Sequence, residues 1–236
     1  MAFKHGKDTQ IFVNAVDFSS YFSNIDASRT ADVAESTTFG NDNKTYIVGV
    51  KDGNLSIGGF FDATADATLQ PLLGGADCVI AYGIDGLDAT DGTTFGQGNI
   101  NNYGVSSPVG DIVATTIDLQ VDSGLYNGTV LENATYTATA NGTARDNTVS
   151  TGNGGGAFLI VSAASGTSPT LDAKITHSAD NVTYADLVTF TQATSTTAEV
   201  KTVAAGTTVN RYLKAVFTIG GTSPSFTAII GFGRNN

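Results

Sequence analysis

The stretch from Arg29 to Asp62 constrains the fold more than any other part of the chain. Thr45–Val50 and Leu55–Phe61 have the composition of two β-strands, and Lys51–Asn54 between them contains the Asp-Gly pair that favours a tight turn. Successive side chains of a strand point to opposite faces, so the odd-numbered residues of the second strand share one apolar face. The pattern predicts a β-hairpin.

A long polar segment, Asn24–Asn43, precedes this hairpin. Val33 and Phe39 are the residues in it that could pack on an apolar core. Loops of this length are usually functional or disordered. The segment is therefore expected to be a loop rather than part of a compact connection.

One short helix is predicted after the hairpin. Asp62 can cap a helix that starts at the next residue, and Asp66 in the first turn is favoured by the helix dipole. Pro71 would break a helix interior, so the helix should end near Gln70. The apolar run Cys78–Tyr82 is then a predicted strand, in which the single cysteine is a small buried side chain.

Strands separated by turn residues continue to the end of the chain. They are predicted at residues 9–22, 94–105, 112–125, 157–164, 170–177, 185–191, 198–203, 211–219 and 225–232. A similar Gly-Thr-Ser-Pro phrase opens two of them, at 165–171 and 220–226, as a weak internal repeat or as one loop type used twice. Short strands at regular spacing are typical of a β-sandwich. The predicted fold is mainly β: an N-terminal β-sandwich or barrel with one short helix, followed by a second small β-sandwich.

The two parts of the chain differ in charge. Residues 1–131 contain 16 acidic and 5 basic residues, a net charge of −11, whereas residues 132–236 contain six of each and have no net charge. Residues 126–156, around this change, are rich in Asn, Thr and Gly. A boundary near Leu131 and Glu132 therefore predicts two domains, 1–131 and 132–236, each of an ordinary domain size.

The composition limits the classes of partner. Charged residues make up only 14% of the chain, against about 25% in a typical soluble domain. A surface with so little charge suits burial in an assembly. A Thr-rich β-sandwich that functions alone would have the same composition, so both interpretations stay open. The acidic balance argues against a nucleic-acid-binding surface. We expect no signal peptide, because the first residues lack an apolar region. No stretch approaches the roughly 20 apolar residues that a membrane-spanning helix needs.

No constellation of catalytic, cofactor-binding or metal-binding residues is recognisable. His5 and His177 have no partner at a catalytic spacing, and the motifs of nucleophile elbows, phosphate loops and zinc-binding helices are missing. The loop Gly83–Gly98 has the acids and glycines of a calcium loop, but no glutamate closes it at the twelfth position. The chain is expected not to be an enzyme and to use no metal or cofactor.

The first half of the chain resembles the tail-tube (major tail) proteins of long-tailed bacteriophages. The matching features are the strand Ile11–Val16, the loop Asp32–Gly40, the hairpin that ends at Gly58–Asp62 and the short helical piece after it. The second half is similar, more weakly, to small accessory β-sandwich domains appended to phage structural proteins.

This resemblance implies a virion structural protein whose subunits form rings, commonly hexameric, that stack into a tail tube through which DNA is ejected. It implies self-assembly, and as further partners the tape-measure, baseplate and terminator proteins, with DNA only transiently in the lumen and no membrane. Assembly would take place in the host bacterial cytoplasm, with residues 132–236 outside the tube. The implied inter-ring contact loop contains Asp32, Val33, Glu35 and Phe39, and the implied tube-wall hairpin contains Tyr46, Val48, Leu55 and Ile57.

A second class of function stays open at this point. The same composition fits a stand-alone virion decoration protein or a carbohydrate-binding β-sandwich module. Rings or tubes in negative stain are expected for the tube subunit, and small monodisperse particles for the module.

Overall fold

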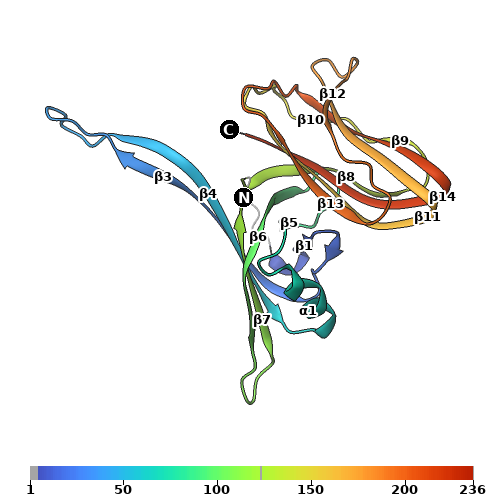
Figure 1. The fold of residues 1–236 in the computed structure, drawn as a ribbon. Helices are drawn as coiled ribbons and strands as arrows, with labels where there is room; N and C mark the ends of the chain where they lie inside the picture. Colours follow the sequence, from blue (N-terminus) through green and yellow to red (C-terminus); the bar gives the residue numbers. More distant parts are fainter. Residues whose placement is uncertain (1–4, 123, 236) are drawn as a thin grey trace. The chain divides into compact units, whose positions relative to one another are not determined.

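The computed structural model describes residues 5–122 and 124–235. It consists of antiparallel β-strands with one short α-helix and two 3-10 helices (Figure 1), which confirms the mainly β prediction. The chain divides into two compact units. Unit 1 contains Met1–Ser20, Val79–Gly96 and Tyr126–Asn236, and unit 2 contains Tyr21–Cys78 and Gln97–Leu125.

The elements follow one another in this order: η1 (Gly6–Asp8), β1 (Gln10–Val13), β2 (Val16–Asp17), β3 (Phe22–Glu35), β4 (Tyr46–Phe60), α1 (Ala63–Leu69), η2 (Gln70–Leu72), β5 (Cys78–Gly83), β6 (Gly92–Ser106), β7 (Ala114–Val121), β8 (Tyr126–Tyr136), β9 (Ala140–Asn141), β10 (Arg145–Asp146), β11 (Gly155–Ser178), β12 (Ala185–Thr189), β13 (Thr197–Val203) and β14 (Tyr212–Arg234).

Unit 2 is built on four antiparallel strands in the order β3-β4-β7-β6. One face of this sheet is apolar and buried, with Leu55, Ile57 and Ile117 each at most 2% exposed. The helix α1 belongs to that face, because the hydroxyl of Tyr103 in β6 donates a hydrogen bond to Asp66 at 2.6 Å. As predicted, Asp62 caps the helix, accepting hydrogen bonds from two backbone N–H groups, and α1 ends just before Gln70.

The prediction of a turn at Lys51–Asn54 is wrong. These residues continue β4, and Gly53 lies opposite Arg29 in β3. The polar segment predicted as a loop, Asn24–Asn43, is β3 as far as Glu35, so the chain turns only beyond it. Gly53 is buried in this strand, and a Cβ there would make only an ordinary contact, 3.4 Å from Cβ of Leu125.

Unit 1 contains the larger core. Its strands follow the order β12-β11-β14-β8-β6-β5-β1-β2, with β13 also paired to β11. One cluster of buried side chains joins Phe95, Tyr126 and Phe158; the centroid of the Phe95 ring lies 5.5 Å from that of Tyr126 and 4.7 Å from that of Phe158. A second cluster, of 19 buried side chains, comes mainly from β11 and β14, includes Val188 of β12 and Val203 of β13, and contains Phe217. Burial of this much apolar surface is the main stabilisation of the unit.

The two Gly-Thr-Ser-Pro phrases lie opposite each other. Four predicted strands merge into two, β11 and β14, and each long strand is interrupted by a bulge at its phrase. A Cβ on Gly166 would lie 2.9 Å from Cα of Pro224, and a Cβ on Gly221 would lie 2.9 Å from Cα of Pro169. Both glycines have positive φ, so each phrase needs its glycine for conformation and for the close approach of the other.

The predicted domain boundary near Leu131 falls inside β8. Val130 belongs to the buried cluster that also contains Phe158 and Ile229, so residues on both sides of the boundary share one core. That residues 132–236 act as a separate domain stays a prediction.

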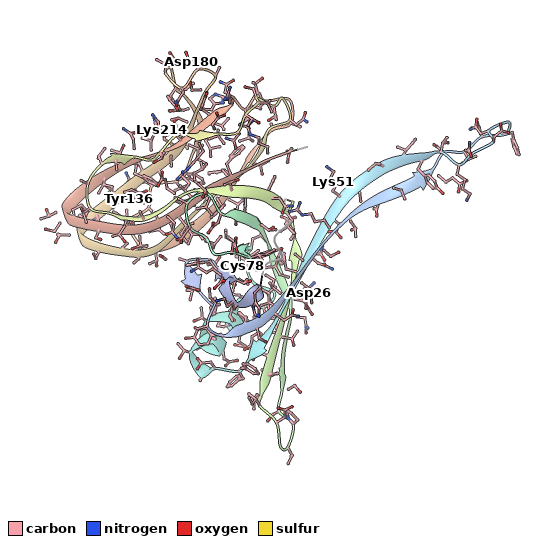
Figure 2. The ribbon with its side chains drawn as sticks, turned by 180° about the vertical axis from the view of Figure 1, so that it is seen from behind. Asp26, Lys51, Cys78, Tyr136, Asp180 and Lys214 are labelled. Atoms are coloured by element: carbon pink, nitrogen blue, oxygen red, sulfur yellow. The ribbon has the colours of Figure 1, made fainter. Side chains whose placement is uncertain are left out.

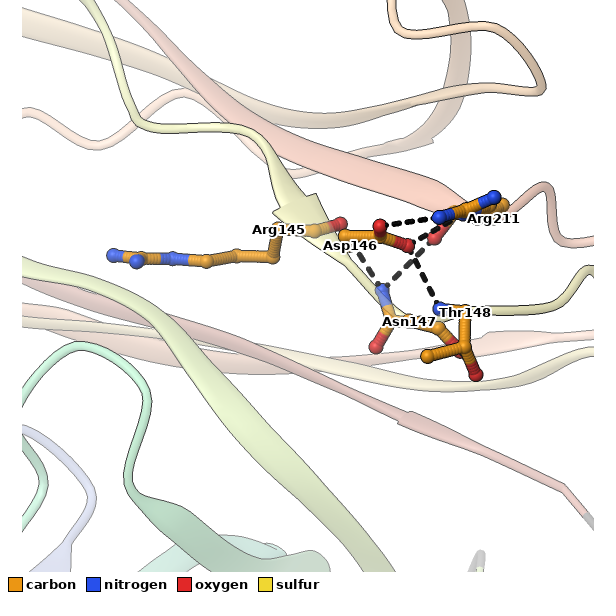
Figure 3. A network of polar contacts seen from close by, with 5 residues as sticks. All are labelled: Arg145, Asp146, Asn147, Thr148 and Arg211. Carbon is orange, nitrogen blue, oxygen red and sulfur yellow. Dashed lines mark hydrogen bonds and ion pairs between the residues drawn. The ribbon is translucent and has the colours of Figure 1, made fainter.

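An ion pair attaches the short strand β10 to the start of β14. Arg211 donates two hydrogen bonds to the carboxylate of Asp146, each at 2.6 Å, and the backbone N–H of Thr148 donates a third at 2.8 Å (Figure 3). The Asn147 amide donates to the carbonyls of Arg145 and Arg211. The hydrogen bonds from Arg211 are the largest cause that lowers the pKa of Asp146 to about 2.

Replacing Asp146 with Asn should make the chain less heat-stable at pH 7. The folded-state pKa lies below the ordinary value of 3.8, so the ion pair stabilises above that pH and is lost as the pH falls towards 2. The difference in melting temperature between wild type and Asp146→Asn should therefore shrink between about pH 4 and pH 2. Asp42→Asn, in the exposed turn after β3, is the control; a constant difference for Asp146→Asn over that range would contradict the assignment.

Candidate functional site

The β3–β4 hairpin extends beyond the sheet of unit 2 as an arm, defined here as residues 31–51. β7 pairs with β4 only from Asn54 onward, so within the arm β3 and β4 pair only with each other among the described strands. Figure 1 shows the arm leaving one end of the sheet and the β6–β7 hairpin leaving the other. A two-stranded hairpin is marginally stable in water by itself, so an arm of this kind is expected to need a partner.

The arm exposes large apolar side chains on both of its faces. Val33 lies opposite Val48 on one face and is 61% exposed; Ile47, opposite Ala34, is on the other face and 62% exposed. At the tip, Phe39 is fully exposed. The polar contacts of the arm are at its surface, as in the 2.9 Å ion pair between Lys44 and Glu35, and such pairs contribute little to stability.

The predicted site residues separate into two groups. The four residues of the predicted contact loop lie in the arm, three at the end of β3 and one in its turn, and two residues of the predicted wall hairpin lie beside them. These are Asp32, Val33, Glu35, Phe39, Tyr46 and Val48. The structure pairs Glu35 with Tyr46. Leu55 and Ile57 do not join this group, because they lie in the buried face of the sheet at 1% exposure.

The opposite face of the unit 2 sheet is open and polar. Its side chains come from the even-numbered positions of β3, β4 and β7 and from β6, and they line a shallow hollow. Asp118 at its centre accepts hydrogen bonds from Ser56 at 2.6 Å and from Asn102 at 2.7 Å. These bonds lower the pKa of Asp118, which therefore carries its charge at neutral pH.

This open face is negatively charged. Asp26 and Asp52 lie on it with Asp118, and Gln120 donates a hydrogen bond to Asp52 at 2.6 Å. In β4, Lys51 has the opposite parity to Asp52 and so points to the other side; Figure 2 labels Asp26 at the base of the arm and Lys51 along it. The sequence analysis did not select this face, although the polar residues at alternate positions of β4 and β7 were a signal for it.

The outer edge of the sheet is also available. β3 is 14 residues long and has β4 as its only strand partner among the described residues, so no described strand pairs with its other side. Such an edge is a template for pairing with another chain. Beyond the arm, then, unit 2 has an open strand edge and an open polar face.

Comparisons with known proteins find similarity in structure but not in sequence. No protein-family model matches the chain, and no curated protein matches it in sequence. Solved structures similar to about half of it include two phage-type tail assemblies and a sheath–tube complex. The C6-symmetric tail of an empty gene transfer agent particle has 14% identity over 52% of this chain and 97% of that chain, with a TM-score of 0.42. The SPP1 tail tube has 13% identity over 55% and 81%, with a TM-score of 0.44.

The third is the sheath–tube complex of the extracellular contractile injection system PVC in its extended state. It has 13% identity over 54% of this chain and 92% of that chain, with a TM-score of 0.45. The chain is similar to tail-tube proteins. This is the class that the sequence resemblance named.

Other chemistry has little to support it in the described residues. Nδ1 of His177 accepts a hydrogen bond from the backbone N–H of Asn210, and burial lowers the pKa of His177, so this histidine has a structural role. Within residues 5–122 and 124–235, no three metal-ligating side chains lie close enough to hold an ion. The helices of the same residues include none with the length and hydropathy to cross a bilayer.

Proposed function

We propose that the chain is a structural subunit of a phage-type tail tube, assembling with copies of itself into stacked rings, commonly hexameric in this class. The observation that carries the proposal is the combination, in unit 2, of an unpaired strand edge, an open polar face and an arm with apolar side chains on both faces. A monomer gains nothing from exposing these groups, and an edge that pairs with a neighbouring copy removes its aggregation hazard.

In the proposed ring, the sheets of neighbouring copies join edge to edge to form the wall. The apolar face, with Leu55 and Ile57, is already buried within the subunit, so the open face with Asp26, Asp52 and Asp118 lines the lumen. A basic wall would bind DNA phosphates through counterion release, and an acidic wall does not. DNA then passes transiently and does not bind.

The remaining assignments follow from the same role. Residues 132–236 form an accessory β-sandwich outside the tube, since a lumen that passes DNA leaves no room for about 100 more residues per copy. The partners besides its own copies are tape-measure, baseplate and terminator proteins. The protein works in the virion tail after assembly in the host cytoplasm, and its role is structural, with no enzymatic step.

The test uses the single cysteine of the chain. Cys78 is 1% exposed and burial raises the pKa of its thiol to about 11, so it should not react with a maleimide at neutral pH. Asn54→Cys places a thiol on the open face, and Val182→Cys places one on an exposed loop of residues 132–236. A polyethylene-glycol maleimide should label both variants as dispersed subunits, and only Val182→Cys once tubes have formed.

Two results would contradict the proposal. If concentrated wild-type protein gave only small monodisperse particles in negative stain, the chain would be a stand-alone module. If tubes formed but Asn54→Cys reacted in them as fast as in dispersed subunits, the open face would not line the lumen. Unmodified wild type is the control for Cys78.

A further inference from the structure

The connection between β13 and β14, residues 204–210, contributes to the larger core of unit 1 and is called here the latch segment. Val209 in this segment is 0% exposed and belongs to the cluster of 19 buried side chains. Its backbone exchanges two hydrogen bonds with Thr151, at 2.8 and 3.0 Å. Opening of the latch segment therefore exposes apolar surface without unpairing any of the long strands.

Two side chains hold the backbone of the latch segment at its C-terminal end. Nδ1 of His177, in β11, accepts a hydrogen bond from the N–H group of Asn210 at 3.2 Å. The guanidinium of Arg234, in β14, donates to the carbonyl of Asn210 at 2.6 Å and to that of Val209 at 2.7 Å. The N–H and C=O groups of one residue are thus bound by an imidazole and by a cation.

The hydrogen bond to His177 exists in only one protonation state of the ring. Nδ1 accepts while the imidazole is neutral, whereas both nitrogens are donors in the imidazolium form. A protonated ring therefore sets one N–H group against that of Asn210. It also adds a second positive charge near Arg234, whose guanidinium, among the described residues, donates only to uncharged oxygens. Burial, and after it the charge of Arg234, lower the pKa of His177.

The surroundings offer a charged His177 no compensating carboxylate. His177 lies opposite Leu213 of β14 and Ala185 of β12. The acids of the adjoining elements have other partners: Asp186 of β12 pairs with Lys174, Glu199 of β13 with Lys201 and Asp146 of β10 with Arg211 (Figure 3), and Asp180 accepts hydrogen bonds within its own loop. Lys214 of β14 lies over the ring of Tyr184. Arg234 is therefore the charge that acts on His177.

We infer that His177 and Arg234 form an acid-sensitive latch, which holds residues 204–210 closed while His177 is neutral and releases them when the ring is protonated. The pKa of His177 in the closed state lies below the ordinary value of 6.5, so the closed state binds fewer protons than the open one. The latch is most stable above about pH 6.5. Below that pH the ratio of open to closed molecules rises by up to about tenfold per pH unit, until the closed-state pKa is reached.

Hydrogen exchange of the dispersed, full-length chain measures the opening. Mass spectrometry follows peptides from 204–210 and from the core strand residues 155–161 between about pH 7.5 and about pH 5, with each rate divided by the intrinsic rate at that pH. The N–H groups of Thr207, Val209 and Asn210 have acceptors in the closed state. Their protection should be constant above about pH 6.5 and fall below it by up to about tenfold per unit, while that of 155–161 stays constant.

His177→Asn is the test variant, because the side-chain oxygen of Asn accepts the same kind of hydrogen bond and does not titrate. Protection of 204–210 in this variant should not depend on pH over the same range. His5→Asn is the matched control, since His5 is exposed and is the other histidine of the chain; it should keep the wild-type pH dependence.

Three results would overturn the inference. The first is wild-type protection of 204–210 that does not fall with pH. The second is protection that falls in parallel with that of 155–161, because the whole unit would then unfold. The third is a His177→Asn variant that keeps the wild-type pH dependence; if this variant does not fold, the wild-type comparison of the two segments still decides. None of these results depends on whether the chain forms tubes.

Discussion

Removing the arm should abolish tube formation and leave a folded, soluble subunit. The register places Thr30 directly opposite Asp52, so residues 31–51 can be replaced by a two-residue Asn-Gly turn that closes the shortened hairpin. The buried face of the sheet is untouched, because Leu55 and Ile57 lie beyond the cut and keep their pairing with β7. The arm packs no buried side chain of its own, so little stability is lost with it.

The measurement compares the shortened chain with wild type by negative stain, sedimentation and circular dichroism at the same concentrations. The expected result is a monomer or a single ring with the wild-type spectrum. Lys44→Ala is a useful companion, since it removes only the exposed ion pair with Glu35 and should assemble normally. Long tubes from the shortened chain would show that the arm has no part in assembly.

Phe158→Ala should destabilise unit 1 by about 3–5 kcal/mol, the usual cost of removing a fully buried Phe. The Phe158 side chain is 0% exposed and its ring lies 4.7 Å from that of Phe95. Gly231 lies directly against it, since a Cβ there would be 2.3 Å from Cε1 of Phe158. The ring therefore fills the space beside Gly231, and its removal leaves a cavity there.

Urea unfolding of the dispersed subunit measures this effect. Phe39→Ala is the matched control, because the same deletion at a fully exposed position should change the free energy of unfolding by no more than about 0.5 kcal/mol. The experiment also tests the domain division. If residues 132–236 were independent, Phe158→Ala would shift one of two transitions; a single cooperative transition that shifts as a whole would place the shared core in one folding unit.

Local signals in the sequence predicted part of this fold. The cap at Asp62, the end of the helix before Pro71 and the buried strand with Cys78 each depend on neighbouring residues, and the structure confirms them. The resemblance also placed the contact residues Val33 and Phe39 in a segment that is exposed.

Other features could not be predicted, because they depend on distant pairing. The sequence predicts a loop over Asn24–Asn43 because this segment is long and poor in apolar residues. A strand that lies outside a core has the same composition, so β3 could not be distinguished from a loop. Asp52-Gly53 signalled a turn, but pairing with Arg29 of β3 holds Gly53 in a strand. The acidic face could not be predicted, because it depends on the pairing of β4 with β7, which places Asp118 beside Ser56, 62 positions away in the chain.

The paired Gly-Thr-Ser-Pro phrases of β11 and β14 have a consequence for how the sequence can drift. Each phrase occupies the space above the glycine of the other, so a larger residue or an insertion in one is tolerated only if the other changes with it. The two stretches lie 55 positions apart in the chain, from Gly166 to Gly221, and we expect them to change together during evolution. Where related sequences differ in one phrase, the compensating substitution is expected in the facing phrase of the other strand.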